Sequence, residues 1–320
     1  MATQNWDAII IGGSAAGLSA AQALGRSLRR TLVIDSGQPR NRFASHMHNV
    51  LGHDGRPPAE LAALGREEAA RYGVEFREGG VAAVRDAGAA VELELEGGEI
   101  LRARGIVLAT GISDELPEIE GLAAHWGTRA AHCPYCHGWE LRGERIGVIT
   151  TSPMSLHQLQ LVRQLSDRVV AFTSGLGALE CETERRLRAR GIELVPQAVA
   201  SVLSDEANGG RLTGVRTVDG REVALDAIFT AATPRPRDEA VASLLLKRAA
   251  GPWGEVIEVD ATGRTSHPRV WAAGNVVAPA AAVPQAMAAG ATAGAALNYA
   301  LVEEDFDLAL AKNGGARDSK

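Results

Sequence analysis

The chain has 320 residues, of which 46% are apolar and 22% are charged, and its formal net charge is −6. This length exceeds that of most single cores, so we expect a globular protein with two domains. The basic residues are scattered and no apolar run reaches membrane-spanning length, which argues against nucleic-acid and membrane partners.

The first predicted element is the apolar strand DAIII, residues 7–11, which runs through GGSAAG into the helix LSAAQALGRSLR. The next strand, TLVID, ends in Asp35. This order of strand, glycine turn, helix, strand and acid is typical of a dinucleotide-binding unit. Gly12 permits the tight turn and Gly17 the close helix packing, while Ser14 replaces the middle glycine. We expect the helix amides to face a pyrophosphate and Asp35 to accept hydrogen bonds from ribose.

The N-terminus enters this strand without the basic region and small-residue cleavage site of a secretory signal. Three cysteines, Cys133, Cys136 and Cys181, are too few for the disulfide framework of a secreted protein. We therefore expect the protein to be cytoplasmic.

The stretch HCPYCHGWE, residues 132–140, contains a Cys-x-x-Cys pair flanked by His132 and His137. A structural zinc site needs about four ligands, usually with a second ligand pair elsewhere in the chain, and no such pair exists. Ligands crowded into so short a stretch also fit a tetrahedron poorly. We expect a redox pair and no metal, with zinc as the alternative. Cys181 lies in an amphipathic helix and is expected to be a packed or partly exposed thiol.

Residues 145–172 repeat the strand–helix–strand pattern as RIGVIT, SPMSLHQLQLVRQL and RVVAF. The turn between the first strand and the helix, TTSPMS, has no glycine. The branched side chain of Thr150 and the missing amide of Pro153 both oppose close approach of a phosphate. No arginine pair follows the second strand to hold a 2′-phosphate. We predict a second nucleotide-binding-type unit that has lost its binding chemistry.

Two further segments resemble flavin-contacting parts of the two-dinucleotide-binding-domain flavoproteins. They are IVLATG, residues 106–111, and TSHPRVWAAGN, residues 265–275, which precedes a long helix of small residues. Asn275 stands where that group usually has Asp, so it can donate hydrogen bonds but brings no charge. The alternative is an ordinary buried strand before an alanine-rich helix. Agreement among three segments favours FAD as the cofactor.

Taken together, these segments resemble the low-molecular-weight thioredoxin reductase family over nearly the whole chain. The form HCPYCHGWE has His137 where those reductases carry Asp. It is closer to the FAD-dependent dithiol oxidase branch, similar to the gliotoxin and holomycin disulfide-forming flavoenzymes.

The resemblance implies an α/β, two-dinucleotide-binding-domain flavoprotein fold and a homodimer. We expect the FAD domain to comprise residues 1–117 and 238–320, and the inserted, smaller NAD(P)-type domain with the cysteine pair to comprise residues 118–237. Proline and charge cluster at the crossings, and the polar tail, residues 311–320, is expected to be disordered. The FAD-contacting residues implied are Gly12, Gly13, Ser14, Ala16, Gly17, Asp35, Ser36, Arg40, Ala109, Thr110, Gly111, Gly274, Asn275, Gln285 and Ala286.

In that family the second cysteine lies against the flavin. The resemblance therefore implies that Cys136 exchanges electrons with FAD and that Cys133 forms the mixed disulfide with substrate. His137 has suitable chemistry to take and return the thiol proton, and His132 is the second candidate. The structural alternative is that both histidines only cap the loop.

Four functions remain open. An FAD-dependent dithiol oxidase would pass electrons from a dithiol to oxygen and form hydrogen peroxide. An NADPH-dependent disulfide reductase would run in the other direction, a third candidate would take electrons from a protein such as ferredoxin, and the fourth is a non-catalytic flavin-bound sensor. The lost glycine turn favours the oxidase. The partner is either a small-molecule dithiol or disulfide or a thioredoxin-like protein.

Overall fold

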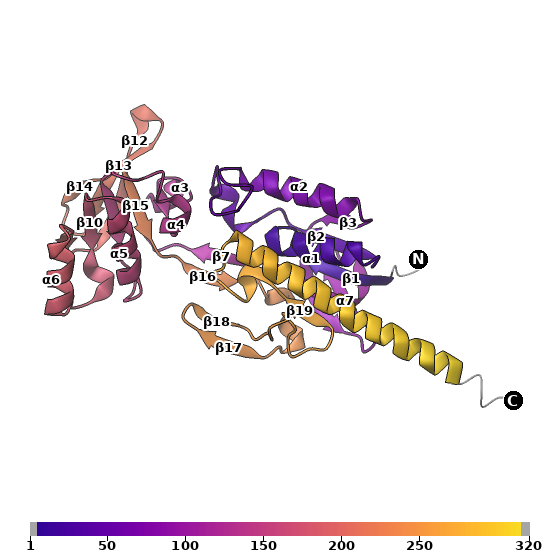
Figure 1. Cartoon of the computed structure of the whole chain (residues 1–320). Helices are drawn as coiled ribbons and strands as arrows, with labels where there is room; N and C mark the ends of the chain where they lie inside the picture. Colours follow the sequence, from indigo (N-terminus) through magenta and orange to yellow (C-terminus); the bar gives the residue numbers. More distant parts are fainter. Residues whose placement is uncertain (1–4, 315–320) are drawn as a thin grey trace. The chain divides into compact units, whose positions relative to one another are not determined.

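The computed structural model describes residues 5–314, which form two compact units (Figure 1). The first unit runs up to Arg40, from Ala59 to Ser113, and from Pro234 onward. The second unit comprises Asn41–Pro58 and Asp114–Thr233. The segment Asn41–Pro58 therefore belongs with the second unit, although it lies in the middle of the first unit's sequence.

A seven-stranded sheet forms the centre of the first unit, with strand order β3-β2-β1-β6-β5-β4 and β19 also paired to β6. The strands are β1 (Asn5–Ile11), β2 (Thr31–Asp35), β3 (Glu75–Glu78), β4 (Val81–Asp86), β5 (Val91–Leu95), β6 (Ile100–Leu108) and β19 (Val270–Ala272). Strands β3, β2, β1, β6 and β19 run parallel, whereas β5 runs antiparallel to both of its neighbours, β6 and β4. Ile9 and Ile11 pack into one core and Ala8 and Ile10 into the other, which explains why the DAIII run is continuously apolar.

Two helices of the first unit approach each other closely. These are α1 (Ala15–Arg26) and α7 (Val283–Gly314), both visible in Figure 1. A Cβ atom on Gly290 would collide with the backbone of Ala16, and one on Gly294 would lie 2.7 Å from the carbonyl oxygen of Ala20. Small residues on both helices therefore bring their backbones together. The third long helix, α2 (Pro58–Ala70), lies almost entirely in this unit.

The second unit has a five-stranded parallel sheet of order β11-β10-β9-β15-β8. Its strands are β8 (Ala130–Ala131), β9 (Ile146–Ile149), β10 (Val169–Phe172), β11 (Glu193–Val195) and β15 (Ala227–Thr230). Its helices are α3 (Leu122–His125), α4 (Pro134–His137), α5 (Ser155–Leu165) and α6 (Cys181–Ala189), and an antiparallel sheet is built from β12 (Val199–Asp205), β13 (Arg211–Thr217) and β14 (Glu222–Ala224). Strand β8 ends directly before the HCPYCHGWE stretch.

Two sheets of two strands each complete the strand pairing. They are β7 (Ile112–Glu115) with β16 (Thr233–Pro236), and β17 (Arg248–Gly251) with β18 (Gly254–Ile257). The short 3₁₀ helices are η1 (Arg40–Phe43), η2 (Thr173–Leu176), η3 (Glu206–Asn208), η4 (Glu239–Leu244) and η5 (Gly274–Val276). The predicted α/β class with a repeated strand–helix–strand unit is confirmed.

The C-terminal helix is longer than the sequence analysis predicts. Helix α7 continues to Gly314, so the disorder expected from residue 311 onward is wrong for residues 311–314, and the remainder lies outside the described residues. Ala311 and Lys312 are good helix formers, and they carry the helix on until glycine is reached. Within the described part of the chain, no helix combines the length and apolar character needed to cross a bilayer.

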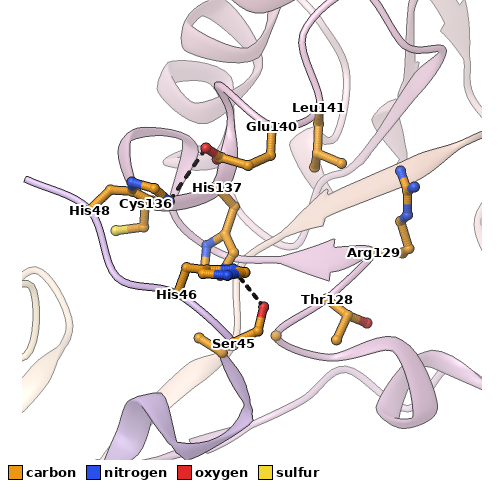
Figure 2. A pocket seen from close by; sticks show the side chains of 11 residues that line it. Ser45, His46, His48, Thr128, Arg129, Cys136, His137, Glu140 and Leu141 are labelled. Carbon is orange, nitrogen blue, oxygen red and sulfur yellow. Dashed lines mark hydrogen bonds and ion pairs between the residues drawn. The ribbon is translucent and has the colours of Figure 1, made fainter. Parts of the chain in front are cut away.

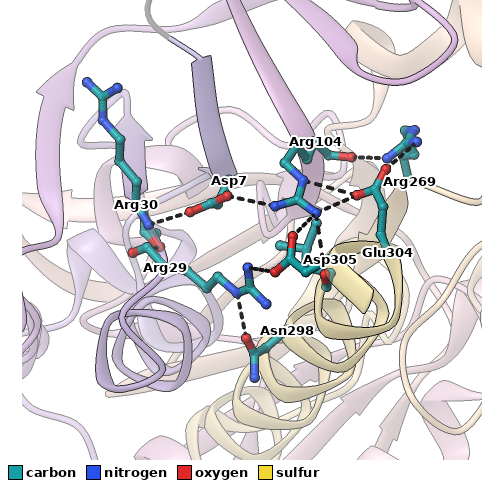
Figure 3. Close-up of polar contacts among 10 residues, drawn as sticks. Asp7, Arg29, Arg30, Arg104, Arg269, Asn298, Glu304 and Asp305 are labelled. Carbon is teal, nitrogen blue, oxygen red and sulfur yellow. Dashed lines mark hydrogen bonds and ion pairs between the residues drawn. The ribbon is translucent and has the colours of Figure 1, made fainter. Parts of the chain in front are cut away.

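A network of ion pairs joins α7 to the sheet of the first unit (Figure 3). The Arg104 guanidinium on β6 lies 3.1 Å from Asp7 on β1, 2.8 Å from Glu304 and 2.6 Å from Asp305. Arg29 reaches Asp305 at 2.7 Å. Burial lowers the pKa of Arg104, and hydrogen bonds to Glu304 and Asp305 more than offset this, so the pKa is raised. Arg104 thus neutralises three carboxylates that would otherwise repel one another.

We predict that Arg104→Met lowers the free energy of unfolding by about 1–3 kcal/mol, because it leaves partly buried carboxylates without their shared partner. Urea denaturation of both proteins measures the difference. Arg85→Met is the matched control, since Arg85 and Glu94 form a more exposed pair and its loss should cost about 0–1 kcal/mol.

The pH dependence of this effect follows from the two carboxylates on α7. Burial raises the pKa of Glu304, but hydrogen bonds from Arg269 and Arg104 lower it overall, and the hydrogen bond from Arg29 is the main cause that lowers the pKa of Asp305. Their stabilisation is fully present above the unfolded-state pKa of about 4 and is lost as the pH falls through the lower folded-state values. The difference between wild type and Arg104→Met should shrink below that pH. A difference that stays constant down to pH 3 would contradict the network's role.

Candidate functional site

The first glycine turn follows β1 in the first unit. Gly12 has a φ of +107°, a conformation that favours glycine, and its amide donates to the Ile34 carbonyl at 2.8 Å. A Cβ atom on Gly17 would collide with the carbonyl of Gly12, and one on Gly13 would lie 2.8 Å from the carboxyl carbon of Asp35. The turn therefore has room only for glycine at these positions.

Helix α1 begins directly after this turn. Ser14 occupies the N-cap position without a side-chain hydrogen bond, and the first helical bond runs from the Leu18 amide to the Ser14 carbonyl at 2.9 Å. The amides of residues 15–17 thus have no partner within the helix. They stand at the positive end of the helix dipole, which favours an anionic group.

The two other segments that we expect to contact flavin, residues 106–111 and 265–275, reach the same edge of the seven-stranded sheet. The Ala109 amide donates to Ile11 at 2.8 Å, and the Ala273 amide donates to Leu108 at 3.0 Å. The hydroxyl of Thr110 is buried and has no hydrogen-bond partner within the described residues. The structure therefore brings together the ends of β1, β6 and β19, together with one unsatisfied hydroxyl group.

Asp35 is held by a residue that the sequence analysis does not predict. Its carboxylate, 13% exposed at the end of β2, pairs with Arg66 of α2. The Arg66 guanidinium also stacks over Phe76, 5.3 Å from the ring centre. Arg66 lies in a helix that carries no nucleotide motif, so only the tertiary structure reveals it.

Several other residues from the predicted list contact the backbone of the protein itself. The Asn275 amide nitrogen donates to the carbonyls of Ala278, Pro279 and Ala281, the last at 2.9 Å. Gln285 accepts a hydrogen bond from the Ala282 amide at 2.7 Å near the start of α7. The role of Asn275 in cofactor binding stays a prediction, and its observed contacts hold the loop before α7.

The corresponding turn of the second unit has its amides occupied. The amides of Thr151 and Ser152 both face the Ser155 hydroxyl, at 3.0 and 3.4 Å. The Thr150 hydroxyl donates to the Phe172 carbonyl at 2.8 Å and accepts from the Gly175 amide at 3.2 Å. Side chains of the turn and of the start of α5 therefore accept the hydrogen bonds of these amides.

The cysteine pair follows β8 in the second unit. Cys133 and Cys136 form a disulfide, with their Cα atoms 5.2 Å apart, and Cys133 is the N-cap of α4. The His137 amide donates to the Cys133 carbonyl at 3.2 Å. The Gln158 side chain of α5 donates to the His132 carbonyl at 2.6 Å, which anchors the residue before the pair.

A cavity of about 240 Å³ opens beside Cys136 within the second unit (Figure 2). His137 and Glu140 line it from the cysteine segment, and His46 and His48 line it from the segment Asn41–Pro58. The structure brings His137 and Cys136 together, as the family resemblance implies. His132 is not among the lining residues, which weakens it as a proton acceptor in this cavity.

His137 is half-buried, and both of its ring nitrogens are shielded from solvent. Its two ring nitrogens make no hydrogen bond of good geometry among the described residues. Burial lowers the pKa of His137, and His48 adds to this effect, whereas Glu140 and the Cys133 carbonyl oppose it. The net shift is downward, so His137 is mainly neutral at pH 7 and able to accept a proton.

The residues of the cavity that carry no role in the sequence analysis include His46, His48 and Glu140. His48 lies 3.4 Å from Glu140 and 3.4 Å from Asp54, and His46 is hydrogen bonded to Ser45 at 2.9 Å. The only signal in the sequence is the histidine-rich stretch SHMHNVLGH, residues 45–53, which is far from the cysteine pair along the chain.

Two findings concern the metal alternative and the third cysteine. The described residues contain no group of three or more His, Cys, Asp or Glu side chains that could hold a metal ion. Cys181 is a free, exposed thiol at the first position of α6.

Comparisons with known proteins agree with this arrangement. The family model described as pyridine nucleotide-disulphide oxidoreductase matches residues 6–293. The chain is 35% identical over 306 residues to thioredoxin reductase tcpT of Claviceps purpurea, covering 92% of this chain and 94% of the relative. It is 30% identical over 316 residues to thioredoxin reductase sirT of Leptosphaeria maculans, covering 94% and 96%.

Solved structures give the same result. HlmI has a TM-score of 0.90 at 39% identity, covering 99% of this chain and 98% of that one. An oxidoreductase from Agrobacterium tumefaciens has a TM-score of 0.87 at 37% identity, covering 93% and 99%. The resemblance to thioredoxin reductases is thereby confirmed. The chain belongs to the pyridine nucleotide-disulphide oxidoreductase family, as a thioredoxin reductase-like, flavin-dependent disulfide oxidoreductase.

Proposed function

We propose that the protein is an FAD-dependent dithiol oxidase that converts a small-molecule dithiol to its disulfide with oxygen as the electron acceptor. The observation that carries the proposal is the turn after β9, where the Ser155 hydroxyl occupies the amides of Thr151 and Ser152. A nicotinamide dinucleotide needs such amides for its pyrophosphate. The cysteine pair is intact, which argues against a non-catalytic flavin-bound sensor.

The residues of the first unit fit FAD. The amides at the start of α1 and the buried, unsatisfied hydroxyl of Thr110 are donors suited to phosphate, and Asp35 is an acceptor suited to ribose. When bound, FAD would supply the two-electron acceptor that reoxidises the cysteine pair and passes the electrons to oxygen, which becomes hydrogen peroxide.

The cysteine pair performs the thiol chemistry. A substrate thiolate attacks the Cys133 sulfur, the Cys133–Cys136 bond breaks, and its electron pair remains on Cys136. The second substrate thiolate then attacks the substrate sulfur of the mixed disulfide and releases the oxidised substrate and the Cys133 thiolate. Two electrons and two protons pass from the dithiol to the cysteine pair.

We assign the proton transfer in this exchange to His137. It lines the same cavity as Cys136, and its lowered pKa leaves the ring neutral at pH 7. A neutral imidazole can accept the proton of an attacking thiol and return it to the departing Cys136 sulfur.

The second candidate is an NADPH-dependent disulfide reductase. The names of the relatives tcpT and sirT support it, since both are called thioredoxin reductases. In this chain such an activity would require a mode of nucleotide binding that does not use the amides of Thr151 and Ser152.

We predict that, without oxygen, dithiothreitol rapidly bleaches the yellow absorbance of the purified flavoprotein, whereas NADPH and NADH bleach it slowly or not at all. Air should restore the absorbance and form hydrogen peroxide. Stopped-flow absorbance and a peroxide assay measure both steps. Complete bleaching by micromolar NADPH within one turnover would assign the protein to the reductases. Bleaching by dithiol without recovery in air would favour a protein electron partner such as ferredoxin.

We predict that Cys133→Ser and Cys136→Ser each abolish dithiol oxidation, because either change removes the exchangeable disulfide. Cys181→Ser should retain full activity, since Cys181 is an exposed thiol on α6. In the Cys181→Ser background, an aromatic disulfide reagent should label Cys133 faster than Cys136 in the respective single-cysteine proteins. The opposite order of labelling would reverse the two roles.

We predict that Asp35→Ala weakens FAD retention at least about tenfold, because each lost charge-assisted hydrogen bond contributes roughly 1.5–3 kcal/mol. Arg66→Met is the control, since it removes the partner of Asp35 but leaves the carboxylate in place. Dialysis followed by absorbance measures bound FAD. Equal losses in both variants would mean that the Asp35–Arg66 pair acts only in folding.

A further inference from the structure

The segment Asn41–Pro58 forms a closed loop that packs with the cysteine segment in the second unit. The Met47 amide donates to the Arg56 carbonyl at 2.9 Å, and the Gly55 amide donates back to the Met47 carbonyl at 2.9 Å. These two bonds join the two sides of the loop. The residues between them are therefore presented to the rest of the unit as one preformed turn.

Asn49 lies in this turn and is held on both its backbone and its side chain. Its φ of +61° is in the left-handed region, which asparagine tolerates better than most residues. Its backbone amide donates to the Asp54 carboxylate at 2.9 Å. Its side-chain amide donates to the Tyr135 carbonyl at 3.0 Å. Because the backbone is already fixed, aiming this donor at α4 costs little conformational entropy.

The Tyr135 carbonyl belongs to the ring that the Cys133–Cys136 disulfide closes. The Cys133 carbonyl accepts hydrogen bonds from the amides of Cys136 at 3.1 Å and His137 at 3.2 Å. Carbonyls in the last turn of a helix need partners from outside the helix. The side chain of Asn49, 86 residues earlier in the chain, supplies such a partner to Tyr135. Asn49 therefore caps α4 between the two cysteines.

We propose that Asn49 is a positioning residue that stabilises the disulfide form of the cysteine pair, so that docking of the loop depends on the redox state of the pair. The disulfide restricts the backbone of residues 133–136, which keeps the Tyr135 carbonyl aimed at Asn49. Reduction opens this ring and lets the carbonyl turn away from its donor. The inference rests on the redox exchange of the pair in the proposed function, whichever acceptor finally takes the electrons.

The coupling has a size and a reciprocal consequence. The hydrogen bond between Asn49 and Tyr135 is exposed to solvent, so we expect it to favour the disulfide form by about two- to fivefold. By thermodynamic linkage, reduction of the pair must weaken the docking of the loop by the same factor.

The first test is the redox equilibrium of Asn49→Gly, a change that removes the side-chain donor and suits the positive φ. The parent protein is the flavin-loaded Cys181→Ser variant, in which every thiol comes from the pair. Both proteins are equilibrated without oxygen in graded ratios of reduced and oxidised dithiothreitol, quenched in acid, alkylated and analysed by mass spectrometry. Reduced dithiothreitol supplies two electrons and two protons to the disulfide and becomes its own cyclic disulfide.

Asn49→Gly should shift this equilibrium toward the dithiol form by about two- to fivefold. That factor raises the midpoint potential by roughly 9–21 mV. Asn49→Asp is the second variant, because it keeps the size of the side chain but turns an acceptor toward the Tyr135 carbonyl. It should shift the equilibrium at least as far in the same direction, and it carries the test if Asn49→Gly does not fold.

The second readout is hydrogen exchange of the amides in residues 45–57, followed by mass spectrometry. Reduction should increase their exchange in the parent protein, and this difference should shrink in Asn49→Gly. Asn208→Gly is the matched control, since it removes an asparagine side chain that donates to Asp205 in η3 of the same unit. It should leave both readouts unchanged.

Each outcome decides the proposal. A midpoint potential in Asn49→Gly that equals that of the parent, or that falls, overturns it and leaves Asn49 as a residue that only holds the loop. Exchange that does not respond to reduction in the parent overturns it as well. Failure to oxidise any dithiol in air, with the shift in potential still present, refutes the proposed function and supports this inference. A parent disulfide that dithiothreitol cannot reduce overturns both.

Discussion

Close approach of backbone segments is the constraint on which the first unit depends. The turn from β1 into α1 can form only because Gly12 and Gly17 have no side chains. A Cβ atom on Gly17 would collide with the Gly12 carbonyl. The same condition governs the contact of α1 with α7, where Gly290 lies against the backbone of Ala16. Without these approaches, the start of α1 could not stand at the ends of β1, β6 and β19. The donors suited to phosphate would then be dispersed.

The two units share one topology but differ in the hydrogen bonding of the turn between strand and helix. In both, a parallel strand leads through a turn into a helix, and the carboxyl ends of the strands meet at one edge of a sheet. In the first unit the amides at the start of α1 have no side-chain partner. In the second, the Ser155 hydroxyl is the acceptor for two amides of the turn. The Ser155 hydroxyl is thus the group that distinguishes the amides of the second turn from those of the first.

The surroundings of the charged groups also differ between the units. Arg104 in the first unit is surrounded by three carboxylates from two elements, and its neighbours on α7 are tied to further arginines. That arrangement stabilises the fold by neutralising charge at the partly buried end of α7. In the second unit, His48 and Glu140 line a cavity that also contains Cys136. There, the titratable side chains lie beside the cysteine pair and His137 and not at the end of a helix.

Local sequence patterns were sufficient to predict the parallel strands, the glycine turn, the cysteine pair and the second strand–helix–strand unit, because each depends on residues that are close together along the chain. Strand alternation, glycine conformation and Cys-x-x-Cys spacing are all local properties. They also predict a role for His137, which is adjacent to Cys136 in the sequence and lines the same cavity. The pairing of Asp35 with Arg66, the loop contacts of Asn275 and the His48–Glu140 bridge could not be predicted in this way. These contacts join elements that are distant in sequence, and their partners are ordinary polar residues whose meeting is decided by how helices and loops pack around each sheet.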